Sequence, residues 1–199
     1  MLEITITILG LIQGVLAMLN KRINWIVYAI QMALLVAFSW FAHLYGDTLQ
    51  NFVYFFVCLG GYYMWKKDSP AEKITTGSTF NKVMWLIIIA TLTLAGGFTL
   101  AATDDPLPYV DSFTTVTTIA GLLLMMAHKL ETWIVWFFND IAYMYQYFNL
   151  PDQALYLFCL YIVWTIMAVA SFINWYKIYN KQKTKKDDMF VMEVIEGEF

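Results

Sequence analysis

The sequence is poor in charge and in cysteine, and both shortages narrow the class of protein. Asp, Glu, Lys and Arg make up 14% of the 199 residues, against about 25% in a soluble domain. Two cysteines are too few for a disulfide scaffold. Disorder is excluded by the 60% of hydrophobic residues and a mean hydropathy of +0.60. An integral membrane protein remains, in which the placement of charge matters more than the net charge of −3.

Seven apolar runs lie between the charged positions. Each run has about 17–25 residues, which at a rise of about 1.5 Å per residue crosses a hydrocarbon core of roughly 30 Å. Because backbone groups in lipid must be satisfied within the protein, we expect each run to be a helix. The expected fold class is an all-α membrane protein with seven transmembrane helices, at residues 4–20, 23–42, 48–65, 83–102, 113–130, 132–149 and 153–176.

The basic residues all fall on one predicted side of the membrane. They are Lys21, Arg22, Lys66, Lys67, Lys73, Lys82, Lys129, Lys177, Lys181, Lys183, Lys185 and Lys186. The opposite side carries the acids Glu3, Asp47, Asp104, Asp105, Asp111 and Asp152. The positive-inside rule then predicts an outside N-terminus and a cytoplasmic C-terminus. Residues 181–199 are expected to form a charged, flexible cytoplasmic tail.

An internal repeat relates the two halves of the chain. Residues 17–32 (AMLNKRINWIVYAIQM) and residues 125–140 (MMAHKLETWIVWFFND) align at an offset of 108 with five identities in 16 positions. The ends of the third and seventh runs match at an offset of 110, where Trp65 and Trp175 each stand near a lysine. We therefore expect two parallel three-helix repeats, at residues 4–65 and 113–176, within one transporter domain of residues 1–180. Two three-helix repeats can have the same orientation in the membrane only if one more helix joins them, and the run at 83–102 is that linker helix. In small transporters with such repeats, the site lies between them near the midplane.

Polar and aromatic side chains recur on equivalent faces of the second and sixth runs. In the second run, the spacing i, i+3, i+6 places Trp25, Tyr28 and Gln31 on one face of the helix. In the sixth run, the same spacing places Trp133, Trp136 and Asn139 on one face, which Asp140 and Tyr143 continue. Paired carboxamides beside aromatic rings suit a flat heteroaromatic ligand that carries a polar sugar. The alternative is ordinary hydrogen bonding between helices, with Trp25 and Trp133 in the interfacial aromatic belt.

Further candidates lie on the other runs. Gln50, Asn51 and Tyr54 open the third run and are expected to line the same cavity. Weaker candidates are Gln13, Tyr156, Tyr161 and Thr165, whereas His43 and His128 near helix ends are expected to be solvated. Asp140 is the one acid deep in a predicted helix, and an ionisable residue at that depth indicates function. It suits a cationic substrate, a sugar hydroxyl, or a protonated structural role.

Other absences limit the chemistry. No Lys or Arg lies deep in a predicted helix, so a phosphorylated substrate would lack its usual clamp. A single acid is thin support for a proton relay, which favours passive uniport. The sequence contains no catalytic, metal-ligand or phosphate-loop motif, so we expect no enzyme activity, no cofactor and no metal. Nothing in it predicts nucleic-acid binding.

Two stretches resemble a known family. Residues 44–65 (LYGDTLQNFVYFFVCLGGYYMW) and 131–140 (ETWIVWFFND) are similar to the bacterial PnuC-type vitamin transporters, the nicotinamide riboside carriers. The likeness covers about residues 5–178, and the family's W-x-x-W signature corresponds to Trp133 and Trp136, followed by Asn139. The first repeat departs from it, with Tyr28 in the second aromatic place.

The resemblance implies a SWEET-like 3+1+3 fold, a homotrimer in the bacterial inner membrane, and facilitated diffusion of a dephosphorylated vitamin that cytosolic phosphorylation then traps. It implies substrate binding by Trp133, Trp136 and Asn139 and, by the repeat, by Tyr28 and Gln31. The family also contains carriers of thiamine, riboflavin and deoxynucleosides, so the substrate stays open. The residues also leave open a substrate-binding subunit of an ATP-driven importer and a sugar uniporter.

The charge distribution makes a direct prediction about topology. A fluorescent-protein reporter fused after Phe199 should fluoresce, and a phosphatase reporter at the same place should be inactive, because the phosphatase needs an oxidising compartment. An active, extracytoplasmic phosphatase would overturn the orientation.

Overall fold

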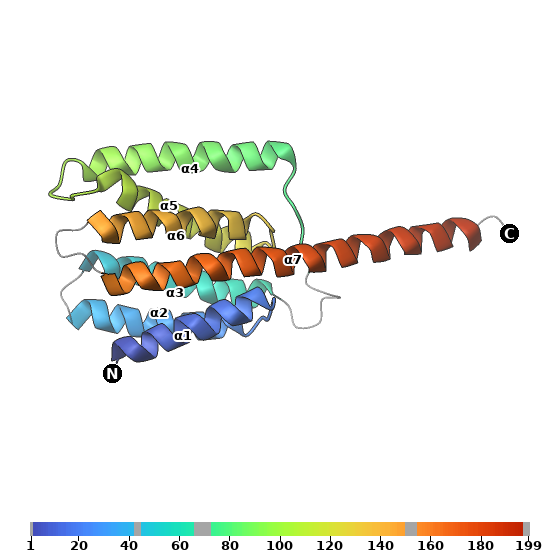
Figure 1. The fold of residues 1–199 in the computed structure, drawn as a ribbon, viewed down its shortest axis with the longest axis horizontal. Helices are drawn as coiled ribbons and strands as arrows, with labels where there is room; N and C mark the ends of the chain where they lie inside the picture. The colour runs from blue at the N-terminus through green and yellow to red at the C-terminus, as the bar shows by residue number, and fades with distance from the viewer. Residues whose placement is uncertain (1, 42–44, 66–72, 150–154, 197–199) are drawn as a thin grey trace.

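The described residues form seven helices, as the apolar runs predict, and one isolated β-bridge between Thr75 and Lys129. The computed structural model describes residues 2–41, 45–65, 73–149 and 155–196. His43 lies outside them. The helices are α1 (Leu2–Met18), α2 (Asn24–Phe41), α3 (Tyr45–Met64), α4 (Thr79–Leu100), α5 (Pro108–Met126), α6 (Thr132–Asn149) and α7 (Leu155–Glu196). They lie side by side in an elongated bundle, with α4 at one edge next to α5 (Figure 1).

Helices α4 and α5 begin four and five residues before their apolar runs (79 against 83 and 108 against 113), and local chemistry explains both. The Ser78 side chain accepts a hydrogen bond from the Asn81 backbone N–H at 3.2 Å, which caps the first turn of α4. Pro108 stands at the start of α5, where its fixed φ suits a helix and its missing N–H costs nothing. Hydropathy registers neither signal, since both lie before the apolar residues begin.

The end of α7 corrects the expectation of a flexible tail. The helix predicted at 153–176 continues to Glu196 and extends well past the rest of the bundle (Figure 1). Residues 177–196 contain no proline or glycine, and they include five Lys, two Met and two Glu, all of which are good helix formers. The composition marks this segment as polar, but it does not end the helix.

Among the described residues, three helical segments are long and apolar enough to cross a membrane: Thr79–Leu100, Pro108–Met126 and Leu157–Lys185. Ile4–Met18 and Asn24–Phe38 are shorter apolar helices. Polar residues lower the hydropathy of α6, yet its Asn139 and Asp140 are only 1% and 5% exposed. These polar groups face the interior of the bundle, while large apolar side chains cover its outside, as a lipid environment requires.

The packing has the same pattern in each half of the chain. α2 packs between α1 and α3, and α6 packs between α5 and α7. The halves meet where α1 contacts α7 and where α3 contacts α5. Each first helix thus touches the third helix of the other half. α4 packs only on α5 among the described helices.

The turns after α1 and α5 match at the offset of 108. Asn20 and His128 are the non-glycine residues with positive φ among the described residues, at 53° and 51°. Lys21 N donates to Leu16 O, and Lys129 N donates to Leu124 O, each at 2.9 Å. Both residues close the helix end in the left-handed conformation that glycine or asparagine usually provides. The aligned positions 20 and 128 therefore share one backbone conformation, although one residue is Asn and the other is His.

Four tryptophans join the halves at the end of the bundle where these turns lie. Trp25 meets Trp65 edge-to-face at 5.5 Å and 86°, and Trp133 meets Trp175 at 5.4 Å and 87°. The indoles of Trp65, the residue after α3, and of Trp175 in α7 also bond across the boundary. Trp65 Nε1 donates to Met126 O, and Trp175 Nε1 donates to Ala17 O, both at 3.1 Å. We call these two hydrogen bonds the tryptophan exchange.

His128 corrects the expectation of a solvated side chain. Its ring stacks on Trp65 with centroids 4.1 Å apart, and it lies 6.3 Å from Trp175. His128 lies in the turn between α5 and α6, outside both helices. Burial there lowers the pKa of the imidazole to about 4. The ring is therefore an uncharged part of the packing at neutral pH.

The tryptophan exchange predicts equal losses of stability from two distant substitutions. Trp65→Phe and Trp175→Phe each remove an indole donor and leave a buried carbonyl without its partner, at a cost of about 1–3 kcal/mol. Thermal unfolding in detergent measures both. Trp40→Phe is the matched control, because Trp40 is 57% exposed. A control that is destabilised as much as the two variants would refute a specific role for the exchange.

Candidate functional site

A cavity of about 370 Å³ lies between the two halves of the bundle. That volume is in the range of small-molecule sites, which is about 300–1,000 Å³. Nine of the ten predicted substrate-binding residues line it: Tyr28, Gln31, Gln50, Asn51, Tyr54, Trp133, Trp136, Asn139 and Asp140. They come from α2, α3 and α6. The structure thus brings together polar and aromatic residues that are more than 100 positions apart in the chain.

Trp25 is the predicted site residue that does not line the cavity. Its side chain is fully buried and packs against Gly61 and Trp65. A Cβ at position 61 would overlap the Trp25 ring, so glycine is required for this approach. Trp25 lies neither in the cavity nor in an exposed aromatic belt.

The two carboxamides are held by the first helix of their own half. Gln31 Nε2 donates to Ile6 O at 3.2 Å. Asn139 Oδ1 accepts from Thr117 Oγ1 at 2.7 Å. These bonds use the amide nitrogen of Gln31 and the amide oxygen of Asn139. Neither bond uses Gln31 Oε1 or Asn139 Nδ2, which have the chemistry of one acceptor and one donor for a ligand.

Two large indoles are positioned by glycines. Trp136 lies against Gly121, where an added Cβ would come within 2.9 Å of Trp136 Cε2. Trp164 lies against Gly14, where a Cβ would come within 2.7 Å of Trp164 Cζ3. Such distances are too short for real contacts, so both rings occupy space that any side chain would take. Aromatic walls of this kind stack on planar ligands.

Trp164 lines the cavity from α7 and is not among the residues predicted from the sequence. The offset of 110 that pairs Trp65 with Trp175 also pairs Tyr54 with Trp164, and that pairing was a usable signal. Thr7, Thr118, Tyr147 and Ser171 also line the cavity and were missed. Small polar residues and tyrosines have no distinctive spacing in an apolar helix.

The weaker candidates divide. Gln13 and Tyr161 line the cavity, and Tyr143 stacks on Tyr161 with ring centroids 4.5 Å apart. Thr165 does not line it, and its hydroxyl donates to Tyr161 O at 2.8 Å. The side chain of Tyr156 lies outside the described residues.

Charge in the cavity is confined to one acid. Asp140 is the ionisable carboxyl group among the described lining residues, and no Lys or Arg is among them. It is 5% exposed. No group of three potential metal ligands occurs among the residues that the structure describes. The cavity therefore suits a neutral or cationic ligand with a planar ring and several hydrogen-bonding groups.

Known proteins match most of the chain. A family model described as "Nicotinamide mononucleotide transporter" matches residues 1–177. The nicotinamide riboside transporter PnuC of Neisseria mucosa is 25% identical over 175 residues, which cover 81% of this chain and 66% of that protein. PnuC of Haemophilus influenzae is 28% identical over 127 residues, covering 61% of this chain and 54% of the relative. The chain thus spans about two thirds of the length of one relative and about half of the other.

A solved structure described as the vitamin B3 transporter PnuC has the same fold. It superposes with a TM-score of 0.73 at 23% identity, covering 90% of this chain and 82% of that one. Likeness at that identity shows the fold alone. The family match, by contrast, extends through all the helices that line the cavity. The chain therefore belongs to the nicotinamide mononucleotide transporter family, a family of membrane transporters and not of enzymes.

Proposed function

We propose that this protein imports a dephosphorylated pyridine nucleoside, nicotinamide riboside, across the bacterial inner membrane. One observation carries the proposal: the cavity combines aromatic walls, two carboxamides and one acid. A planar pyridinium ring would stack on Trp136 and Tyr28. Ribose hydroxyls would meet Gln31 Oε1 and Asn139 Nδ2, and the single positive charge of the ring would lie near Asp140.

The lining favours the riboside over the mononucleotide. A phosphate carries nearly two negative charges and is usually held by Arg or Lys. The described lining residues offer neither, and Asp140 would repel a phosphate. Both of the PnuC relatives are named as riboside transporters. Phosphorylation in the cytoplasm would then trap the imported molecule, because the product no longer fits the cavity.

The architecture supports alternating access by two parallel repeats. In this proposal residues 4–65 and 113–176 are the repeats, α4 is the linker, all seven helices span the membrane, and the N-terminus lies outside. The matching turns at Asn20 and His128 and the tryptophan exchange support the repeat. We further propose a homotrimer, for which the large apolar side chains exposed on the outside of the bundle offer a surface. One acid in the cavity favours passive uniport over proton coupling.

Thiamine is the second candidate, and Asp140 is the observation that favours it. The thiazolium ring of thiamine is also planar and cationic, so the same stacking and charge pairing apply. Riboflavin and deoxynucleosides lack a cationic ring, and free sugars have neither an aromatic ring nor a positive charge. The cavity therefore favours the cationic vitamins among the substrates that the family allows.

A binding panel separates these ligands. Isothermal titration calorimetry on purified protein should show binding of nicotinamide riboside. Nicotinamide mononucleotide, riboflavin and glucose should bind at least about tenfold more weakly, a difference of about 1.4 kcal/mol. Trp136→Ala and Asn139→Ala should each weaken riboside binding. If thiamine binds and nicotinamide riboside does not, thiamine is the substrate instead. If both variants bind the riboside as tightly as the unchanged protein, Trp136 and Asn139 are not part of the binding site.

A pair of glycine substitutions tests whether the cavity shape matters. Gly121→Ala forces the Trp136 ring to move, and we expect it to lower the affinity for nicotinamide riboside about tenfold. Gly60→Ala is the matched control, because a Cβ there meets Met126 Cε at an ordinary 3.6 Å. Equal affinities in the two variants would exclude Trp136 as a wall of the site.

A further inference from the structure

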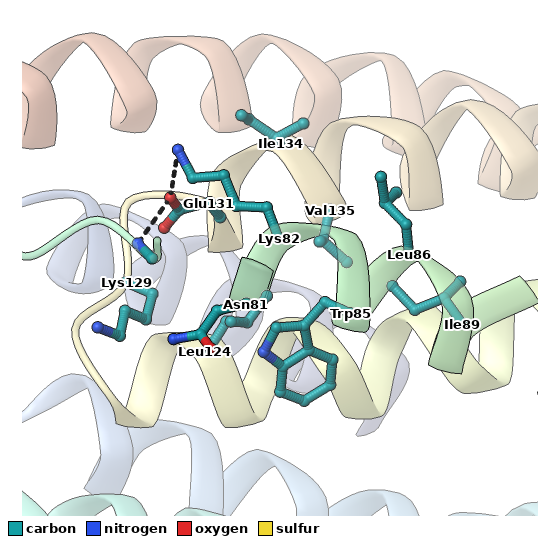
Figure 2. Close-up of a pocket in the computed structure, with 11 residues that line it drawn as sticks. Asn81, Lys82, Trp85, Leu86, Ile89, Leu124, Lys129, Glu131, Ile134 and Val135 are labelled. Atoms are coloured by element: carbon teal, nitrogen blue, oxygen red, sulfur yellow. Dashed lines mark hydrogen bonds and ion pairs between the residues drawn. The ribbon is translucent and has the colours of Figure 1, made fainter. Parts of the chain in front are cut away.

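A second hollow lies on the outside of the bundle, away from the proposed substrate cavity. It has a volume of about 240 Å³ and lies between α4, α5 and α6. Figure 2 shows Trp85, Leu86 and Ile89 of α4 along it, opposite Ile134 and Val135 of α6. Leu124 of α5 also lines it. Leu86 and Ile134 are 67% and 45% exposed, so the groove faces whatever surrounds the bundle.

Unequal packing of α4 on α5 creates this groove. Near its C-terminal end, α4 approaches α5 closely, because Gly97 lies directly against Tyr109 and Ser112 Oγ donates to Thr93 O at 2.9 Å. At its N-terminal end, α4 instead presents the large side chains of Trp85 and Ile89. The helix cannot pack as closely there, and an apolar groove is left between the helices.

One end of the groove is polar and anchored. Glu131 Oε1 accepts from the Gly77 backbone N–H at 3.0 Å and pairs with Lys82 Nζ at 3.0 Å (Figure 2). Lys129 lies at the same end and forms no ion pair within the described part of the chain. Two hydrogen bonds join Thr75 to the backbone of His128 and Leu130, which fixes the segment before α4 against this turn.

We infer that this groove binds an anionic phospholipid, with an acyl chain along α4 and the phosphate at Lys129 and Lys82. Two lysines and one carboxylate leave the polar end with one net positive charge, which complements a single phosphodiester. From Lys82 to Ile89, the helix rises about 10 Å, enough to hold the upper half of an acyl chain. Trp85 lies between the two zones, where indoles favour the membrane interface.

The groove differs from a plain apolar face because it has a basic end at Lys82 and Lys129 and an apolar part along α4. A second protein copy would need to bury Lys129 and half-exposed Lys82, whose side chain is 48% exposed, against its own surface. A phospholipid can contact both parts at once, because its phosphate would lie at the basic end and its acyl chain along the apolar part. Lipid binding here is independent of the substrate and of the transport mechanism.

Native mass spectrometry of the purified full chain tests the inference with defined lipids. Dioleoylphosphatidylglycerol should bind about fivefold more tightly than dioleoylphosphatidylcholine. Lys129→Gln should remove that preference, and Lys181→Gln, an exposed lysine on α7, should leave it unchanged. Val135→Phe should fill the groove and weaken binding of both lipids.

Two outcomes would overturn the inference. If Lys129→Gln and Lys181→Gln reduce the preference for phosphatidylglycerol equally, the lipid is attracted by the overall basic charge and the groove is not a specific lipid site. If Val135→Phe leaves lipid binding intact but changes the mass of the oligomer, a second copy of the chain covers the groove instead. Substrate binding by calorimetry should be the same in all three variants, which separates failure here from failure of the proposed function.

Discussion

The tryptophan exchange is the interaction on which the rest of the bundle depends. Trp65 and Trp175 are fully buried, and an indole N–H or a backbone carbonyl that is shielded from water needs a partner in the protein. Trp65 and Trp175 each find that partner at the end of the first helix of the opposite half. This pins α3 to α5 and α7 to α1 at one end of the bundle, and His128 stacks beside the joint. The cavity that we propose for the substrate lies between the halves joined in this way.

The same constraint explains how the cavity can be polar. Gln31 and Asn139 would each be costly in hydrocarbon, but each forms a hydrogen bond with the first helix of its own half. One polar end of each side chain is thus satisfied and oriented, and in our proposal the other end binds the ligand. Asp140 lies beside this pair, and glycines at positions 14 and 121 make room for Trp164 and Trp136. Two of the polar residues that lower the hydropathy of α6, Asn139 and Asp140, therefore line the cavity.

Much of this arrangement was predictable from the sequence, because long apolar runs and helical periodicity are strong signals. Helix α6 has the predicted bounds, 132–149, and nine of the ten predicted site residues line the cavity. What failed depended on tertiary contacts. Trp25 shares a spacing with Tyr28 and Gln31 but packs on Gly61 instead of the cavity. His128 was expected to be solvated because its partners lie on other helices, and the α7 extension has a polar composition that hydropathy cannot tell from a loop. The outer groove arises from unequal packing of α4 on α5, which no periodicity reveals.

Purified protein in liposomes tests most directly whether this chain is by itself a carrier for nicotinamide riboside. Vesicles that contain only this protein, with no ATP and no ion gradient, should accumulate labelled nicotinamide riboside until the inside and outside concentrations are equal. Enclosing a riboside kinase with ATP should then drive total uptake past that level. Uptake that requires an imposed gradient or a separate ATPase, or the absence of uptake above that of empty vesicles, would contradict the account.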